Sequence, residues 1–324
     1  SRPAGPQIKL GAAAQRRRRK KVPMTDQENL QVQNNLFDIY SGILFNNQTF
    51  ADSGEKAEIT YNFDCPEYKT LIEKYGIDKI AGEGAAFERG VRLMHWMAPK
   101  LTHKSDYDNH IPFNSLALLE YSLDKPEQGI NCRNKSIILT ECCLALGIYA
   151  RRVYIMPYSP YDGDNHVVSE IYDPELGKWV MLDPTTSCYF IDKNDVPLSL
   201  LEIRDRFANL QYAAAVEAEA DTSDKNALWE GNIWYNAYTA KNLFRFMVDG
   251  INGFGQGDKQ TLYFSPAGCS VKQSRLANIR YRYERYASLE DEDTQKEFEK
   301  ETDKANASPE PPSHNVSLLT APPQ

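Results

Sequence analysis

Three features that would each indicate a protein class are scarce in this sequence. No stretch of about 18 apolar residues occurs in its 324 residues, so no transmembrane helix is expected. Six cysteines are too few for a disulfide scaffold in a chain of this length, and no pair has the CxxC spacing of a zinc site. Acidic residues outnumber basic ones, and the net charge of −8 argues against a nucleic-acid binder.

The same scarcities favour a cytoplasmic protein with reduced thiols. The first residues also lack the apolar region of a secretory signal peptide. No cofactor or metal is expected. His103 and His110 flank Asp106 and Asp108, but their spacing matches no firm ligand pattern, so we favour a polar loop over a metal site.

Composition divides the chain into five segments. Residues 1–24 are rich in Pro, Ala and Arg, and 288–324 are charged and then rich in Pro and Ser, so both are expected to be disordered tails. Between them we expect an N-terminal extension at 25–83, a catalytic core at 84–205 and a C-terminal extension at 206–287 that packs on the core. A chain trimmed to 25–287 is therefore expected to keep its stability.

Helices and strands are segregated along the chain, which predicts an α+β fold rather than an alternating α/β fold. Apolar periodicity predicts an early group of helices, and β-forming residues then predict strands joined by a turn at 173–177. The expected helices are 84–101, 114–121, 132–146, 198–210 and 235–248, and the expected strands are 149–156, 166–172, 178–182, 261–264 and 278–283.

One cysteine is placed for chemistry by its position on a helix. A thiol attacks as the thiolate, and the free N–H groups and dipole at a helix N-terminus favour negative charge. Cys132 opens the predicted apolar helix, after Gly129, whereas Cys142 and Cys143 lie in its middle. We therefore expect Cys132 to be the most reactive thiol and the other two to be small core residues.

The hairpin that follows supplies a base and an orienting acid. If Asp173 pairs with Lys178 across the turn, Asp183 lies diagonally from His166 on the same face of the two strands. Each residue alone is more often structural than catalytic. Together, in this order, they indicate a Cys132–His166–Asp183 triad.

The segment from Asn131 to Thr185 resembles the transglutaminase-like superfamily. It contains Asn-Cys132 before an apolar helix, then Gly147-Ile-Tyr-Ala-Arg-Arg-Val, His166-Val-Val-Ser-Glu and Trp179-Val-Met-Leu-Asp-Pro-Thr. The family has the same four motifs in the same order, and the pattern is similar to stand-alone bacterial members. Two departures concern the entry loop: Ile130 stands where the family often has Gly, and Arg133-Asn134-Lys135 stand where it often has small residues.

The resemblance implies a papain-like fold, in which the nucleophile helix packs on an antiparallel sheet, and acyl transfer on a peptide or protein amide. Peptidase and transamidase activities would use the same triad, and a catalytically silent binding module is the alternative. Gln128 and Asn131 are candidates for the second oxyanion donor beside the Cys132 N–H, and Glu170 is a candidate supporting group. Candidates for the substrate groove are Trp179, Asp164 and Asn165. The aromatic group Trp229, Trp234, Tyr235 and Tyr238 is either groove or core.

Overall fold

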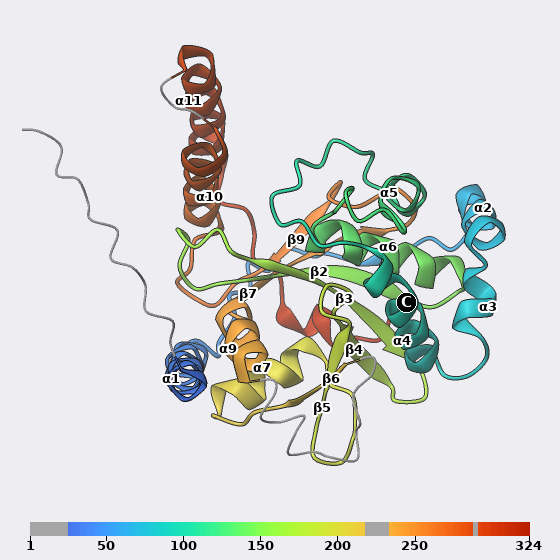
Figure 1. Ribbon diagram of the computed structural model, residues 1–324. Coiled ribbons are helices and arrows are strands. Elements are labelled where there is room, and N and C mark those ends of the chain that lie inside the picture. Colours follow the sequence, from blue (N-terminus) through green and yellow to red (C-terminus); the bar gives the residue numbers. More distant parts are fainter. Residues whose placement is uncertain (1–24, 218–232, 288–290) are drawn as a thin grey trace, which may run out of the picture.

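The computed structural model describes residues 25–217, 233–287 and 291–324. Its centre is a five-stranded antiparallel sheet in the order β4-β3-β2-β7-β9 (Figure 1). These strands are β2 (Ala150–Met156), β3 (His166–Asp173), β4 (Lys178–Leu182), β7 (Arg245–Asp249) and β9 (Thr261–Phe264). The α+β expectation is confirmed.

Helices cover both faces of the sheet (Figure 1). One face packs on helices from the first half of the chain, in a core that includes Ile138, Ile171 and Leu182. These helices are α2 (Pro66–Tyr75), α3 (Ile77–Ala81), α4 (Ala86–Met97), η1 (Ala98–Lys100), α5 (Ser115–Ser122) and α6 (Cys132–Ala145). The other face packs on a second core that includes Phe37, Val168 and Phe207. Its helices are α1 (Asp26–Phe45), α7 (Leu200–Ala208) and α9 (Ile233–Asn242).

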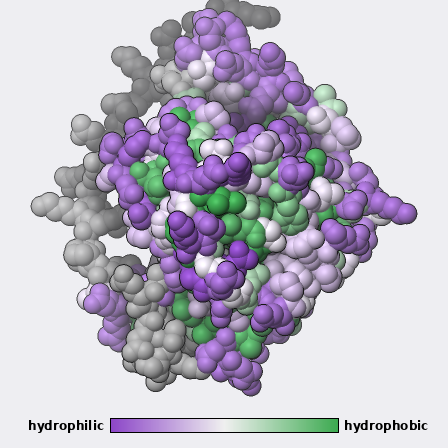
Figure 2. Space-filling view, turned by 90° about the vertical axis from the view of Figure 1, so that its right-hand side faces the viewer, coloured by the Kyte–Doolittle hydropathy of each residue, from purple (hydrophilic) through white to green (hydrophobic). Residues whose placement is uncertain are grey.

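Short strands and a helical hairpin complete the described chain. Two small sheets pair β1 (Thr60–Tyr61) with β8 (Ile251–Asn252), and β5 (Cys188–Ile191) with β6 (Ala214–Glu217). Helices α10 (Val271–Tyr286) and α11 (Glu292–Ala307) lie side by side and project from the body beyond β7 and β9 (Figure 1). From the side on which α2, α3 and α4 lie, the surface has a hydrophilic rim and hydrophobic residues gather near its centre (Figure 2).

The first half of the secondary-structure prediction is confirmed, and two later elements differ. Residues 245–248 continue a predicted helix in the sequence but form β7, because Phe246 and Val248 fill the buried sheet between β2 and β9. The sequence predicts a strand at 278–283, but these residues lie inside α10, which is capped by Ser270. Alternation of aromatic and basic residues there suits either structure, and the pairing of α10 with α11 selects the helix.

The expectation of a disordered C-terminal tail is wrong for residues 291–324. After α11 the chain returns to the body, and Leu319, in η2 (Val316–Leu319), is 4% exposed within the core. Arg151 Nη2 donates to the Leu319 carbonyl at 2.5 Å, and Trp179 Nε1 donates to the Ala321 carbonyl at 2.9 Å. The Pro- and Ser-rich composition does not indicate this docking, because main-chain carbonyls accept many of the hydrogen bonds that hold the segment in place. Residues 1–24 lie outside the described residues.

Within the described residues, no helix is both long and apolar enough to cross a membrane. All six cysteines are free thiols.

Candidate active site

Cys132 is the first residue of helix α6, as the sequence predicts. The side chain of Asn131 caps this helix and accepts the N–H of Asn134 at 3.2 Å. The N–H groups of the first turn have no acceptor within the helix and favour an anion there. Cys142 and Cys143 are buried farther along α6, and burial raises the pKa of both thiols, that of Cys143 to about 12. Position on the helix thus separates Cys132 from its two neighbours.

Side-chain hydrogen bonds lock α6 onto strand β3. Ser136 Oγ donates to the Val167 carbonyl at 2.8 Å, and Ser169 Oγ donates to the Ser136 carbonyl at 3.1 Å. Ser136 lies one helical turn beyond Cys132, and Val167 is one residue beyond His166. These bonds therefore bring the start of the helix to the start of the strand, where the thiol and the imidazole meet.

The hairpin has the predicted register, which brings His166 and Asp183 together. Asp173 pairs with Lys178, and the ladder continues to Ser169 opposite Leu182. Asp183 follows directly and lies diagonally from His166. The His166 Nε2 and Asp183 Oδ2 atoms are 2.7 Å apart, and both side chains are buried.

Asp183 is held by more donors than the sequence indicates. The Tyr235 hydroxyl donates to Oδ2 at 2.7 Å, the Thr186 hydroxyl donates to it at 2.9 Å, and the Thr185 N–H donates to Oδ1 at 2.9 Å. Tyr235 comes from α9, 52 residues away in the chain. Its place in an aromatic run is the only sequence signal, and that run also suits ordinary core packing.

Electrostatics make His166 and Asp183 an ion pair. Burial lowers the pKa of His166, but the charge and hydrogen bond of Asp183 outweigh burial and raise that pKa to about 10. Burial raises the pKa of Asp183, and the charge of His166 outweighs it and lowers that pKa to about 2. Cys132 also raises the pKa of His166, by hydrogen bonding and by charge, so the three side chains share one site. Since Nε2 contacts Asp183, Nδ1 is the ring nitrogen left for the thiol.

Lys135 adds an unexpected cation to the site. It lies one turn beyond Cys132 on α6 and is 2% exposed. Burial lowers its pKa to about 8, against the opposing effect of the negative charges of Asp183 and Cys132. Within the described residues its ammonium makes no hydrogen bond or ion pair. The sequence marks Lys135 only as a departure from the small residues common after the nucleophile.

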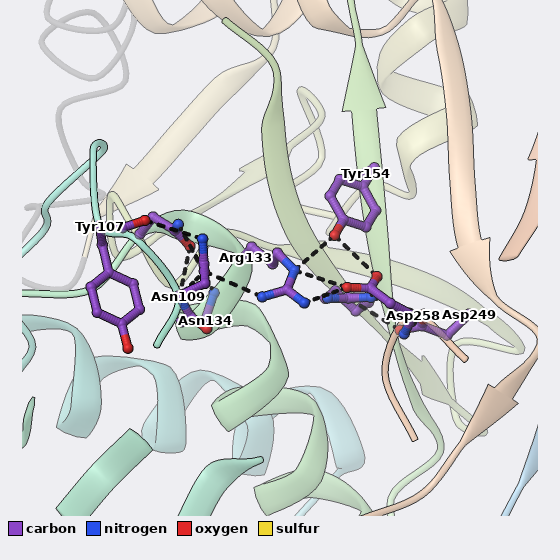
Figure 3. A network of polar contacts seen from close by, with 9 residues as sticks. Tyr107, Asn109, Arg133, Asn134, Tyr154, Asp249 and Asp258 are labelled. Atoms are coloured by element: carbon purple, nitrogen blue, oxygen red, sulfur yellow. Dashed lines mark hydrogen bonds and ion pairs between the residues drawn. The ribbon is translucent and has the colours of Figure 1, made fainter. Parts of the chain in front are cut away.

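Arg133 accounts for another of those departures, because it anchors the helix start to a distant loop (Figure 3). Its Nε atom donates to the Tyr154 hydroxyl at 3.1 Å and to Asp258 Oδ2 at 2.9 Å. Arg152 bonds to the same aspartate and to Asp249, and it is fully buried. The first turn of α6 is thus tied to the loop between β8 and β9.

The candidates for an oxyanion donor and a supporting group lie in three different environments. Gln128 has a buried Oε1 atom with no hydrogen-bond partner in the described ranges of the chain. Asn131 is occupied as the helix cap, and its Nδ2 donates to Asn109 Oδ1 at 3.2 Å. Glu170 forms a buried ion pair with Arg151 at 2.6 Å and accepts the Leu200 N–H. Glu170 therefore supports packing between the sheet and α7, and as a carboxylate it has no donor for an oxyanion. Asn131 uses one of its two Nδ2 hydrogens on Asn109 within the described residues, which leaves the second as a donor.

The groove candidates divide into two groups. Trp179 is not brought to the site: it is buried under the C-terminal residues, four positions from Asp183 along an extended strand, and stacks on Tyr61 and Arg151. Asp164 lies beside the site, paired with Lys241 at 2.8 Å. Asn165 directly precedes His166 and lines a cavity of about 380 Å³.

The aromatic group also divides. Tyr235 is a core residue bonded to Asp183, and Tyr238 packs its ring edge-to-face with His166 at 5.6 Å between centroids. Trp234 is half exposed, and Trp229 lies outside the described residues.

A metal centre has no support in the part of the chain that the structure describes. No group of three or more His, Cys, Asp and Glu side chains is arranged there to hold an ion. His110 instead pairs with Asp108 at 2.5 Å, and His103 lies near the triad, where burial and the charges of Lys135 and His166 lower its pKa.

Comparison with known families agrees with this geometry. Residues 74–184 match the family model described as the transglutaminase-like superfamily, and all three triad candidates fall inside the match. This segment, about a third of the chain, is a transglutaminase-like core. Comparisons with curated proteins and with solved structures gave no match.

Proposed function

We propose that this transglutaminase-like core catalyses acyl transfer from an amide, with Cys132 as nucleophile, His166 as acid and base, and Asp183 as the group that orients His166. The single observation that carries the proposal is the buried 2.7 Å contact of His166 with Asp183, on a histidine whose other partner is the thiol of Cys132. Cysteine nucleophiles are recognised by this arrangement of thiol, base and orienting group.

The reaction begins with an ion pair. With the pKa of His166 at about 10, the imidazole keeps its proton at neutral pH and stands beside the thiol as a cation. The Cys132 thiolate adds to the amide carbonyl, so that an S–C bond forms and the C=O electrons move onto oxygen. The Cys132 N–H, free of any acceptor within the helix, donates to that oxyanion.

The intermediate collapses when the C–N bond breaks. His166 gives its proton to the departing amine, and a thioester remains on Cys132. Water or a second amine, losing a proton to His166, then attacks the thioester and restores the thiol. Hydrolysis and transamidation differ only in this acceptor. Asp183 remains ionised throughout, and its hydrogen bonds to Tyr235 and Thr186 prevent it from turning away from the imidazole.

Selective alkylation tests the nucleophile. Folded protein is treated with limiting iodoacetamide at pH 7, and the six thiols are compared by peptide mapping. Cys132 is expected to be modified first, with the half-buried Cys65 and Cys269 as internal controls. His166→Asn should slow modification of Cys132 by at least about tenfold and leave the two controls unchanged. If either control thiol reacts first, Cys132 is not the nucleophile.

A substrate screen tests the reaction itself. Glutamine- and asparagine-containing peptides are incubated with and without a primary amine, and ammonia release, chain cleavage and amine incorporation are measured. Activity that disappears in Cys132→Ser supports acyl transfer, and the amine dependence separates transfer from hydrolysis. Rapid alkylation of Cys132 without turnover of any peptide would point to an amide outside this set, whereas an inert Cys132 would indicate a binding module.

A further inference from the structure

The cavity lined by Asn165 lies between the sheet and α10. Its volume is about 380 Å³, and it is lined by residues of β2, β7, β9, α10 and α11 together with Asn165. Apolar side chains such as Met156 and Ile279 form part of the wall. The size suits one or two side chains of a bound peptide.

Arg245 is a buried cation in this wall without a carboxylate partner. It is 6% exposed, and its Nε atom is buried with no hydrogen-bond partner among the residues that the structure describes. Its Nη1 atom donates to the Ser274 hydroxyl, and within the described residues it forms no ion pair. The positive charge of Arg245 therefore lies in the cavity wall without a carboxylate beside it in the described part of the chain, whereas buried charges are normally paired.

The remaining charges of the wall leave a positive surplus. Arg275 and Arg282 also line the cavity, and Glu301 is the one carboxylate among the lining residues. Glu301 is already paired with Arg282 at 2.5 Å. Arg245 and Arg275 therefore have no counter-charge in the described wall.

Three features connect the cavity to the triad. Asn165 lines the cavity and is followed in the chain by His166. Tyr154 also lines it, and its hydroxyl accepts from Arg133, the residue after Cys132. Tyr281 of α10 packs so closely on Gly163 that a Cβ atom there would collide with its ring, which holds α10 against the loop before His166.

We propose that this cavity binds a carboxylate of the substrate, so that the enzyme prefers acidic peptides. A substrate carboxylate supplies the counter-charge that Arg245 and Arg275 lack in the described wall, and guanidinium groups present the donors that a carboxylate accepts. The carboxylate side chain lies within a few residues of the reacting amide, because the cavity begins one residue before His166. This inference rests on the proposed function, since it takes peptides as the substrates.

Binding of matched peptides tests the proposal without requiring turnover. The probes are fluorescent peptides with a central Gln, randomised neutral flanks and one Glu at each of three positions on either side. The matched set carries Gln in place of Glu. Anisotropy titrations use the full chain with Cys132→Ser, so that no probe is consumed. At the correct position the Glu peptide is expected to bind about tenfold more tightly than its Gln partner.

The variants locate the preference. Arg245→Met and Arg275→Gln should each reduce the ratio between Glu and Gln peptides by about five- to tenfold. Arg275 is exposed, so its replacement keeps the test valid if Arg245→Met fails to fold. Arg280→Gln is the matched control, because Arg280 is exposed on the same helix, pairs with Glu284 and does not line the cavity.

Equal binding of Glu and Gln peptides at every position overturns the inference, as does a preference that survives Arg275→Gln. Inorganic phosphate at millimolar concentration is the competitor: loss of Glu-peptide binding supports a shared anion site, and phosphate binding without any Glu preference overturns the substrate role. If Glu peptides bind as expected but Cys132 is inert, the proposed function fails and the cavity assignment stands. If peptides are turned over without any preference for acidic residues, the cavity assignment fails and the proposed function stands.

Discussion

Replacing Asp183 by Asn should leave His166 neutral at pH 7, whereas in the wild type it is a cation. The substitution keeps the size of the side chain but removes the negative charge. Its single amide oxygen also cannot replace both carboxylate oxygens, which accept from Thr185 on one side and from Tyr235 and Thr186 on the other. The charge and hydrogen bond of Asp183 are what raise the pKa of His166 to about 10 against the effect of burial. Without the carboxylate, the effect of burial on the imidazolium is no longer opposed. We therefore expect the pKa of His166 to fall below its ordinary value of 6.5.

The size of the effect on stability follows from the same quantities. At about 1.36 kcal/mol for each pKa unit, the difference between 6.5 and about 10 corresponds to a ceiling of about 5 kcal/mol. Removing one partner of a buried ion pair typically costs about 3–5 kcal/mol, which agrees. A histidine with a raised pKa contributes fully below pH 6.5, and its contribution is lost as the pH rises through about 10. Asp183, with a lowered pKa, contributes above pH 3.8 and loses its contribution as the pH falls through about 2.

Two measurements check this. Urea unfolding at pH 5.5, 7.5 and 9.5 should show a free-energy gap between wild type and Asp183→Asn that is largest at pH 5.5 and narrows towards pH 10. NMR titration should show that the His166 ring of the wild type keeps its proton past pH 9. In the variant the ring should titrate with a pKa below 6.5. Asp205→Asn, an exposed change on α7, is the control and should leave both unchanged. A gap that stays constant with pH, or a ring that titrates alike in both proteins, would refute the ion-pair argument.

Three further predictions address the supports of the site. Ser136→Ala removes the bond to the Val167 carbonyl and should cost about 1 kcal/mol of unfolding free energy while slowing iodoacetamide modification of the nucleophile. Ending the chain after residue 308 removes the carbonyl partner of Arg151 and the buried apolar residues of η2. Calorimetry should therefore show a melting temperature lower by about 10 °C. An unchanged melting temperature would mean that the segment does not dock. Burial raises the pKa of Glu141 to about 7, so its contribution to stability is present below pH 4.5 and lost as the pH rises through about 7. Glu141→Gln cannot ionise, and urea unfolding at pH 5 and pH 8.5 should show its stability relative to wild type improving at the higher pH.

The parts of the site that could be predicted from the sequence depend on short-range geometry. The start of α6 at Cys132 was expected from the apolar helix that follows Gly129, and the structure adds Asn131 as its cap. The pairing of Asp173 with Lys178 follows from a short turn, and because side chains alternate along strands, this register alone places Asp183 on the face of His166. Such rules need only neighbours in the chain, and they were sufficient to place Asp183 beside His166. The approach of Cys132 to His166 depends on the packing of α6 against β3.

Only the tertiary structure decided the environment of those three residues. Tyr235 reaches Asp183 from another helix, burial lowers the pKa of Lys135, and Arg133 pairs with Asp258, 125 positions away. The docking of residues 291–324 was hidden for a related reason, since backbone carbonyls that accept from Arg151 and Trp179 leave no trace in composition. Burial and long-range pairing are properties of the packed chain, so the sequence by itself determined which side chains meet at the hairpin, and packing determined their charge.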